Sequence, residues 1–439
     1  MRTALTLLGF FSGAALMMAC SASGSTALFN NTGGATGTGS AQGGNASTGS
    51  KTTTGSGEGG DIGFDAGLSG SGGAGPANCN SGPSDDNDKD GFTVAEGDCN
   101  DCDPNVNPAA VEVIAIAGAD GGVPTPVDEN CDGKIDNLPP PCDVGLDVAD
   151  SDPMNGARAV DLCHLATGPK DYGVVSAKWC MADGAPPPGN PSFDLGHGML
   201  SGFGPNVKVQ AGGRMLGLSS GTARQPTDPG YMSVGGFDKG YTGNQPQGFP
   251  KESPACPGTT TGTPHDPTGL EIVVRAPSNA HGFSFNFNFF TYEWPSYICS
   301  TYNDFFVALL SPIPMGQSDG NISFDTQGNP VSVNNAFIEV CGCAGSGGPP
   351  CQAGGKTFPC ALGNQGLVGT GFQDQFQDHG STGWLFTKAP VTPGDQITMR
   401  WAVYDSGDGI LDTTTLIDNW QWIAEPGTQV GTGVVPTPK

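Results

Sequence analysis

Basic residues are scarce in this sequence, and long apolar stretches are missing after the first twenty positions. Only 17 Lys and Arg stand against 43 Asp and Glu, which gives the 439 residues a formal net charge of -26. Without a basic patch to neutralise phosphates, the chain is not expected to bind nucleic acid or anionic lipid directly. No later stretch has the roughly 18 consecutive apolar residues of a membrane-spanning helix. Acidic surfaces attract divalent cations, and calcium is the cofactor that this composition favours first.

Histidine is also scarce, and its spacing gives no metal-binding pattern. The chain has five: His164, His197, His265, His281 and His379. One motif favours an enzyme, because Gly217-Leu-Ser219-Ser-Gly221 fits the G-x-S-x-G turn that exposes a nucleophilic serine in hydrolases. That turn requires a helix after the serine, whereas residues 222–230 contain two prolines and do not fit a helix. We therefore predict a protein that is not an enzyme; a secreted or surface hydrolase that uses Ser219 is the alternative.

The N-terminus has the pattern of an export signal. Arg2 precedes an apolar run over residues 4–18, which is shorter than the ~20 residues of a spanning helix. The run ends in Leu16-Met-Met-Ala-Cys20, which resembles the lipobox of bacterial lipoproteins. The resemblance implies cleavage before Cys20 and a diacylglycerol on its thiol. Because Ser21 follows, it also implies a lipid-anchored protein of the outer membrane or cell surface. An ordinary signal peptide that ends near a cysteine is the alternative.

Composition divides the chain after the signal peptide (residues 1–19) into four parts. Residues 20–78 are rich in Gly, Ser and Thr and cannot bury enough apolar surface to fold, so we expect a disordered tether. Such a coil has a reach of roughly 40–45 Å. Residues 79–142 form an acidic, cysteine-containing module, called the acidic module below. Residues 143–425 form a larger domain, and residues 426–439 a flexible tail.

Cysteine usage agrees with export, because an oxidising compartment favours disulfides. Removing Cys20 from the 14 cysteines leaves 13, an odd number, so at least one is free or pairs with another chain. Cys163 with Cys180 and Cys256 with Cys299 are candidate pairs. Zinc is the alternative to disulfides for four clustered cysteines, although these lack the C-x2-C spacing of common zinc sites: Cys341, Cys343, Cys351 and Cys360.

Two loops of the acidic module carry oxygen donors at alternate positions, followed by glycine. They are Asp86-Asn-Asp88-Lys-Asp90-Gly91 and Asp128-Glu-Asn130-Cys-Asp132-Gly133. Alternate donors on a tight loop converge on one calcium ion, but the bidentate Glu of an EF-hand is missing, because Gly97 and Pro139 stand in its place. Asp98, Asp101 and Asp103 are available as further donors. The predicted metal ligands are Asp86, Asp88, Asp90, Asp98, Asp128, Asn130, Asp132 and Asp136.

The acidic module also resembles a known family of metal-binding repeats, named for MopE, a copper-binding surface protein of methane oxidisers. The matching segments are residues 86–91, Gly97-Asp98-Cys99, Asn107-Pro108-Ala109 and residues 130–136. The resemblance implies bound metal. Hard carboxylate donors, oxidised cysteines and the lack of histidine in the module favour calcium over copper. The alternative is a solvated acidic linker without metal.

The larger domain has the patterns of β-strands. Phe283, Phe285, Phe287 and Phe289 alternate with polar residues, which indicates a strand with one apolar face. Further strands are expected at residues 270–275, 304–310, 336–340, 396–404 and 415–423. Asp152-Pro153 is typical of a helix start, and we expect a short helix to about Leu165. The fold class predicted is mainly β, a β-sandwich or jelly roll.

This domain resembles the choice-of-anchor L domain of bacterial surface proteins. The resemblance lies in residues 213–224, 283–290, 302–309, 320–324, 330–335 and 416–420 and spans roughly residues 150–425. It implies a β-sandwich at the cell surface without an agreed catalytic activity. The expected role is therefore binding or structural, towards a polysaccharide or another cell-surface protein, with the membrane contacted through the lipid anchor.

Two further sets of residues are candidates for binding in this domain. Asp405, Asp408 and Asp412, together with Asp418, fit a second cation site, and an acidic surface turn is the alternative. Aromatic residues near the strand ends are candidates for an exposed polysaccharide-binding face, although aromatics of a β-sandwich more often lie in its core: Tyr292, Trp294, Tyr297 and Trp384.

Overall fold

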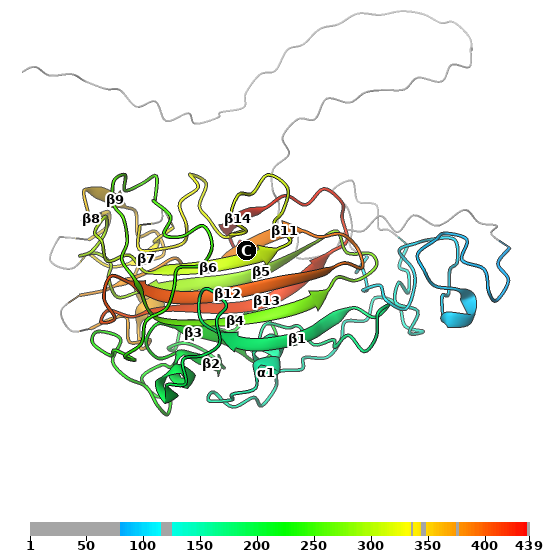
Figure 1. Ribbon diagram of the computed structural model, residues 1–439, viewed down its shortest axis with the longest axis horizontal. Helices are drawn as coiled ribbons and strands as arrows, with labels where there is room; N and C mark the ends of the chain where they lie inside the picture. Colours follow the sequence, from blue (N-terminus) through cyan, green and yellow to red (C-terminus); the bar gives the residue numbers. More distant parts are fainter. Residues whose placement is uncertain (1–79, 116–124, 335–336, 344–347, 375–376, 437–439) are drawn as a thin grey trace, which may run out of the picture. The chain divides into compact units, whose positions relative to one another are not determined.

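The computed structural model describes residues 80–115, 125–334, 337–343, 348–374 and 377–436 (Figure 1). The signal peptide, Cys20 and the tether predicted for residues 20–78 lie outside this part of the chain. Within it, no helix combines the length and the apolar character needed to cross a membrane.

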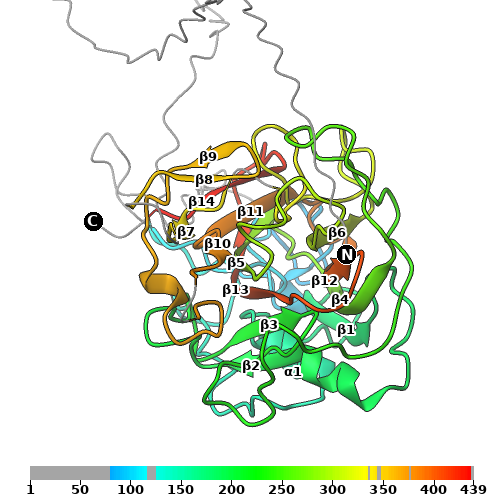
Figure 2. The same ribbon diagram turned by 90° about the vertical axis from the view of Figure 1, so that its left-hand side faces the viewer.

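Two antiparallel sheets form the larger domain, which confirms the mainly β prediction. The first sheet has the order β1 (Gly173–Cys180), β4 (Pro264–Arg275), β12 (Gln396–Ser406) and β6 (Phe305–Ser311). The second has the order β14 (Gly431–Val434), β11 (Leu385–Pro390), β5 (Gly282–Thr291), β13 (Thr413–Ile423), β3 (Met215–Ser219) and β2 (His197–Leu200). Figure 2 shows the two sheets side by side, with their strands seen nearly end-on.

Short elements complete the described fold. β10 (Gly380–Ser381) pairs with β5 and with β7 (Val340–Cys341), while β8 (Cys351–Ala353) and β9 (Lys356–Phe358) form a separate hairpin. The helical pieces are α1 (Pro153–Arg158) and the 3-10 turns η1 (Val94–Glu96), η2 (Pro191–Gly196) and η3 (Gln365–Leu367).

Strand β5 supplies the centre of the core. Its four alternating phenylalanines are fully buried and face the first sheet. Phe285 packs on Trp401 with ring centroids 5.4 Å apart, and Phe287 packs on Phe306 at 5.0 Å. Burying one such side chain contributes about 1.5–3 kcal/mol to stability, so this strand favours the packed sandwich strongly.

The polar face of β5 is buried as well, which its pattern did not predict. Asn288 is buried, and its Oδ1 accepts a hydrogen bond of 2.6 Å from Ser381 Oγ. A second hydrophobic cluster, which includes Phe203, Phe290 and Phe372, covers this side of the sheet. The side-chain oxygen of Asn288 therefore finds its hydrogen-bond donor inside the protein instead of in water.

Three expected elements differ from the structure. Helix α1 begins as predicted, with Asp152 accepting a hydrogen bond from the Met154 amide, but it ends at Arg158 because Asp161 turns the chain with φ 69°. The strand expected at residues 336–340 is reduced to Val340–Cys341 among the described residues. The tail expected at residues 426–439 contains β14, which pairs with β11.

Five disulfides join cysteines that both lie within the described residues. Cys256–Cys299 is confirmed, whereas the candidate pair Cys163–Cys180 is wrong. Cys163 bonds to Cys142, and Cys180 is the buried free cysteine of the described part of the chain. The five pairs are Cys99–Cys131, Cys142–Cys163, Cys256–Cys299, Cys341–Cys360 and Cys343–Cys351, and Cys102 is also disulfide-bonded.

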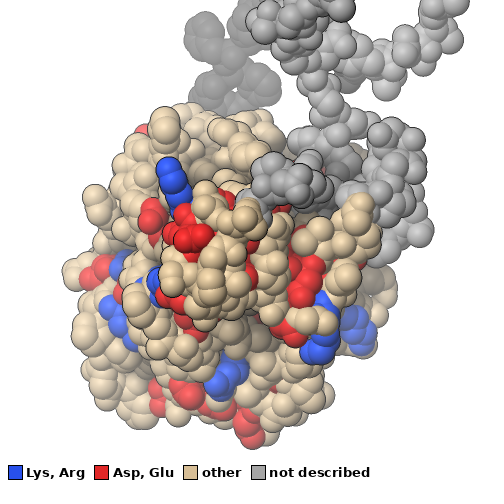
Figure 3. Space-filling view, turned by 90° about the vertical axis from the view of Figure 1, so that its right-hand side faces the viewer, with Lys and Arg blue, Asp and Glu red and all other residues tan. Residues whose placement is uncertain are grey.

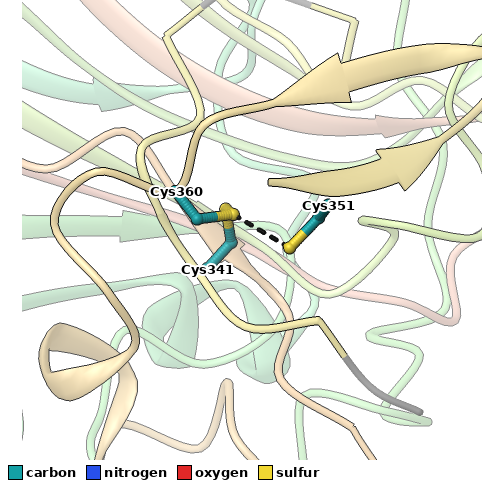
Figure 4. Close-up of side chains that lie close together, drawn as sticks. All are labelled: Cys341, Cys351 and Cys360. Atoms are coloured by element: carbon teal, nitrogen blue, oxygen red, sulfur yellow. Dashed lines mark hydrogen bonds between the residues drawn. A yellow bond between two sulfur atoms is a disulfide. The ribbon is translucent and has the colours of Figure 1, made fainter. Parts of the chain in front are cut away.

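The four clustered cysteines form two adjacent disulfides. Cys351 Sγ lies 3.2 Å from Cys360 Sγ, which is itself bonded to Cys341 (Figure 4). Because each sulfur is already bonded to another, the cluster offers no thiolates, and cysteine binds zinc only as a thiolate. The disulfide interpretation of these residues is therefore confirmed.

The acidic module contacts the sandwich through hydrogen bonds. Lys170 Nζ donates to Gly91 O at 2.6 Å and pairs with Glu96 at 2.7 Å. The Val111 amide donates to Asn279 Oδ1 at 3.0 Å, and Asn279 Nδ2 donates back to Val111 O at 2.8 Å. The module has few apolar residues to bury, so these polar contacts and the Cys99–Cys131 disulfide hold much of it in place.

Candidate metal centres

On the face of the molecule shown in Figure 3, Asp and Glu gather in groups, whereas Lys and Arg are more scattered. In the acidic module, two overlapping groups share Asp88. One consists of Asp86, Asp88 and Asp90, the other of Asp88, Asp98 and Asp101, and within each group one oxygen per residue lies within 4.8 Å of the others. Five carboxylates therefore surround a small volume, and four of them are predicted ligands.

Local backbone turns orient these carboxylates. Lys89 and Gly91 have left-handed φ values of 68° and 94°, which let the loop close tightly. Asp90 Oδ1 accepts a hydrogen bond of 2.7 Å from the Phe92 amide, and Asp98 Oδ1 accepts one of 2.8 Å from the Asn100 amide. One oxygen of each carboxylate therefore holds the loop, and the other is left for a ligand.

In these two overlapping groups, three carboxylates have a buried oxygen without a protein partner. The Oδ2 atoms of Asp88, Asp90 and Asp98 are inaccessible to water and have no hydrogen-bond partner among the described residues. Burial, and then repulsion between neighbouring carboxylates, raises the pKa of Asp90 to about 6. Buried oxygens of this kind are costly unless a proton or a cation compensates them.

A third group of carboxylates in the module contains two residues that the loop pattern did not predict. Glu112, Glu129 and Asp136 place one oxygen each within 4.8 Å of the others. Burial, together with repulsion from Glu112, raises the pKa of Glu129 to about 7. Glu112 Oε2 and Asp136 Oδ1 lack hydrogen-bond partners in the described structure. Of the predicted ligands of the second loop, only Asp136 belongs to this group.

The other predicted ligands of the second loop hold the loop itself. Asp128 Oδ2 accepts from the Gly133 amide at 2.8 Å, Asn130 Oδ1 from the Asp132 amide at 2.9 Å, and Asp132 Oδ1 from the Lys134 amide at 2.9 Å. The structure does not bring these three residues into a converging group with Asp136. Glu112 was missed because it lies outside both acidic loops, and Glu129 because the loop pattern counted donors only at alternate positions.

The candidate second cation site lies inside the sandwich. Asp405 and Asp412 are 2% and 0% exposed, and neither carboxylate oxygen of Asp412 has a hydrogen-bond partner within the described residues. Burial and the neighbouring Asp304 raise the pKa of Asp405 well above its usual range. Asp408 is only half-buried, and Asp418 belongs to a different group, beside Asp161. The alternative of an acidic surface turn does not fit this burial.

Two further carboxylates join Asp405 and Asp412. Glu293 and Asp304 are buried beside them, and burial with mutual repulsion raises the pKa of both well above the usual range. Lys239 is the buried base nearby, and its Nζ donates to Ser219 O at 3.0 Å and to Thr268 Oγ1 at 2.7 Å. Glu293 and Asp304 flank β5 and β6 and carried no local motif, so only the pairing of the sheets reveals them.

Ser219 ends β3 and is fully buried. Its hydroxyl donates to Thr413 O at 3.0 Å and accepts from Thr414 Oγ1 at 2.9 Å, so both neighbours come from β13. Residues 220–224 continue as irregular chain, whereas a nucleophile turn leads into a helix. This environment is that of a structural serine.

The aromatic candidates divide between core and surface. Trp294 is buried, which contradicts its place on an exposed face, and packs edge-on against Phe358. Tyr292 is half-buried, stacks on His379 with ring centroids 3.4 Å apart and donates to Asp374 at 2.7 Å. Tyr297 is 37% exposed and packs against the exposed Tyr302, whereas Trp384 is half-buried.

Comparison with known proteins bears on the sandwich alone. Residues 255–420 match the model of the Choice-of-anchor L domain, from the loop before β4 into β13. The resembling segment at residues 213–224 and strands β1, β2 and β3 precede the matched region. A search among curated proteins finds no match to the chain. Residues 255–420 of this chain therefore form a choice-of-anchor L domain.

Proposed function

We propose that the protein is a lipid-anchored surface protein in which calcium stiffens the acidic module, and that this module presents the sandwich for binding or for a structural role. The observation that carries the calcium proposal is the set of unpaired, buried Oδ2 atoms of Asp88, Asp90 and Asp98. Calcium takes six to eight oxygen ligands, and carboxylates, carbonyls and water supply them. The donors of all three groups in the acidic module are carboxylates only, which suits calcium better than copper or zinc.

The location proposed rests on two kinds of observation. The choice-of-anchor L domain and the disulfides indicate an extracellular or cell-surface protein. The lipobox-like segment before Cys20 supports a diacylglycerol anchor in the outer membrane. Mass spectrometry of the mature N-terminal peptide tests the anchor, because an acylated Cys20 adds the mass of its lipid, whereas an unmodified N-terminus would remove this part of the proposal.

A thermal melt of the full chain tests the calcium proposal. With free calcium at 100 times the dissociation constant, one bound ion adds about 2.7 kcal/mol to the free energy of unfolding. We expect the melting temperature to fall on chelation in the wild type and to fall much less in a variant carrying Asp88→Asn and Asp90→Asn. The matched control is Asp395→Asn, an exposed carboxylate of the sandwich. A wild-type melting temperature that chelation leaves unchanged would refute the proposal.

The same chemistry extends the proposal to Asp405 and Asp412, with Glu293 and Asp304 as further donors. Four buried carboxylates near a single buried lysine require either protons or a cation, because uncompensated buried charge is very costly. Calcium titration of an Asp405→Asn and Asp412→Asn variant tests this site. We expect a lower stoichiometry than in the wild type, and an unchanged stoichiometry would leave shared protons as the explanation.

For the sandwich we propose binding to a polysaccharide or to another cell-surface protein, without catalysis. Tyr297 and Tyr302 support a recognition surface, because they lie exposed beside each other. The buried hydroxyl of Ser219, hydrogen-bonded to β13, gives no support to the alternative of a hydrolase. A glycan array probed with wild type and with a Tyr297→Ala and Tyr302→Ala variant tests the polysaccharide version. Absence of any wild-type binding would leave only a protein partner or a structural role.

A further inference from the structure

A cleft with a volume of about 1110 Å³ lies where the acidic module meets the sandwich. Residues from four segments line it: 108–114 and 130–140 of the module, and 161–173 and 420–422 of the sandwich. Hydrogen bonds hold the two parts beside each other, and one of them runs from the Ser278 amide to Ala109 O at 3.0 Å. Ligand sites commonly have volumes of roughly 300–1,000 Å³ and lie at such junctions. The cleft therefore has room for a small ligand or for part of a long one.

Aromatic rings from the sandwich are part of the lining. Trp422, at the end of β13, is half-buried and packs edge-on against Trp420 with ring centroids 5.4 Å apart. Tyr172 is also half-buried, and its ring stacks on that of the exposed His164 at 4.2 Å. From the module, Leu138 adds a side chain that is 68% exposed. Apolar surface of this kind is costly in water, so a ligand that covers it gains binding energy.

Amide side chains lie among these apolar groups. Gln421 is exposed, Asn130 and Asn137 are half-buried, and all three line the cleft. Asn137 Nδ2 donates to Asp132 Oδ2 at 2.9 Å, whereas its Oδ1 has no hydrogen-bond partner in the described part of the chain. Trp420 is 5% exposed, and its indole Nε1 also lacks a partner there. The lining residues therefore include an unused acceptor and an unused donor, and a hydroxyl group can pair with either.

The charge of the lining selects against anionic ligands. Three lining residues are acidic: Glu112, Asp132 and Asp161. Lys134 is the single Lys or Arg among the described residues of the cleft, so acidic polysaccharides and phosphates are repelled. The protein itself engages two of the carboxylates, because Asp132 accepts from the Lys134 amide at 2.9 Å and Asp161 accepts from the Asn419 amide at 3.2 Å. Amides and aromatic rings are left to contact a ligand, which favours a neutral ligand over a cationic one.

We propose that this cleft binds a neutral saccharide. The rings of Trp422 and Tyr172 contact the face of a sugar unit, and the amides of Gln421 and Asn137 contact its hydroxyl groups. A sugar suits such a lining because the C–H groups on its ring faces are apolar, whereas its hydroxyl groups both donate and accept hydrogen bonds. The inference rests on the polysaccharide binding proposed above, and it gives that binding a site at the junction with the acidic module.

The acidic module couples this cleft to the calcium proposal. Glu112 lines the cleft and also belongs to the third carboxylate group, with Glu129 and Asp136. Asn130 and Asp132 line the cleft from the second acidic loop. A cation bound at Glu112 holds this part of the lining in place, whereas repulsion between the carboxylates loosens it in chelator. Saccharide binding should therefore weaken on chelation, although no cation takes part in the saccharide contacts themselves.

An array of neutral and acidic glycans, probed with the full chain in calcium, tests the cleft. We expect the wild type to bind neutral glycans, and calorimetry with one of these should show that Trp422→Ala raises the dissociation constant at least about tenfold. Trp422→Phe keeps a ring and should retain most of the affinity. Gln421→Ala changes an exposed side chain, so folding is not at risk, and should weaken binding about two- to tenfold. The matched control is Trp384→Ala, a half-buried tryptophan outside the cleft, which should keep the wild-type affinity.

The outcomes separate this inference from the proposed function. Loss of binding in the Tyr297→Ala and Tyr302→Ala variant, with full binding in Trp422→Ala and Gln421→Ala, would overturn the cleft and keep the polysaccharide role at the tyrosines. Wild-type binding to an oligolysine peptide and to no neutral glycan would overturn the saccharide. Chelation without effect on a binding that Trp422→Ala weakens would support the cleft and contradict the calcium proposal. Wild-type crystals soaked with the bound glycan should show it beside Trp422, which covers the case in which Trp422→Ala does not fold; glycan elsewhere with an empty cleft would overturn the inference.

Discussion

His197 should make the sandwich less stable as the pH falls, because its ring is buried in the neutral form. The ring is fully buried and stacks on Trp179 with centroids 3.8 Å apart, and neither ring nitrogen has a hydrogen-bond partner within the described structure. Burial, together with the positive charges of Arg224 and Lys239, lowers its pKa from 6.5 to about 3. Asp194, the carboxylate nearest to Nε2, is 3.8 Å away and largely exposed, so it compensates little.

The sign and size of the effect follow from proton uptake. Below pH 6.5 the unfolded chain binds a proton at this histidine and the folded chain does not. The free energy of unfolding therefore decreases as the pH falls from 6.5 to about 3. At pH 4.5 the folded histidine is still neutral, and two pH units of difference amount to about 2.7 kcal/mol. That is a large part of the 5–15 kcal/mol that is typical of a folded domain.

Urea unfolding of wild type and His197→Phe, at pH 7.5 and at pH 4.5, measures this contribution. Phenylalanine keeps the stacking on Trp179 and cannot bind a proton, so the variant should gain about 2.7 kcal/mol relative to the wild type between the two pH values. The carboxylates titrate equally in both proteins and cancel. His164→Phe controls for the loss of a histidine, since His164 is half exposed and pairs with Asp171. Parallel stability changes in wild type and His197→Phe would refute the reasoning.

Three further predictions concern the core, the thiol and the acidic module. Phe287→Ala should cost about 3–5 kcal/mol in urea unfolding, because it leaves a cavity against Phe306; a cost below that of an exposed substitution would contradict the core assignment. Burial raises the pKa of the Cys180 thiol to about 12, so a thiol reagent should label it only after denaturation, and rapid labelling of the native chain would contradict its burial. The pKa of Glu129 is raised to about 7, so in chelator the folded state loses stability as the pH rises from 4.5 through 7. Glu129→Gln should therefore raise the melting temperature in chelator at pH 8 and reduce the gain from added calcium; a lower melting temperature in chelator would refute this.

Features with local causes could be predicted from the sequence. The alternation of Phe283 to Phe289 predicted β5, because one face of a strand repeats every two residues. The Asp152-Pro153 pair predicted the start of α1, because a cap acts on an amide only two residues away. The first acidic loop likewise brings Asp86, Asp88 and Asp90 together through its own turns. The odd number of cysteines required a leftover one, and Cys180 is free.

Only the tertiary structure decided which distant residues meet. Glu112 joins Glu129 and Asp136, Asp304 joins Asp405, and Asp143 meets Asp161, because sheet pairing and loop packing bring together segments whose separation along the chain has no periodic signal. Disulfide partners depend on the same distances, which is why Cys163 bonds to Cys142 and not to Cys180. Composition set the excess of negative charge, and the fold determined where that charge is buried and needs a compensating proton or cation.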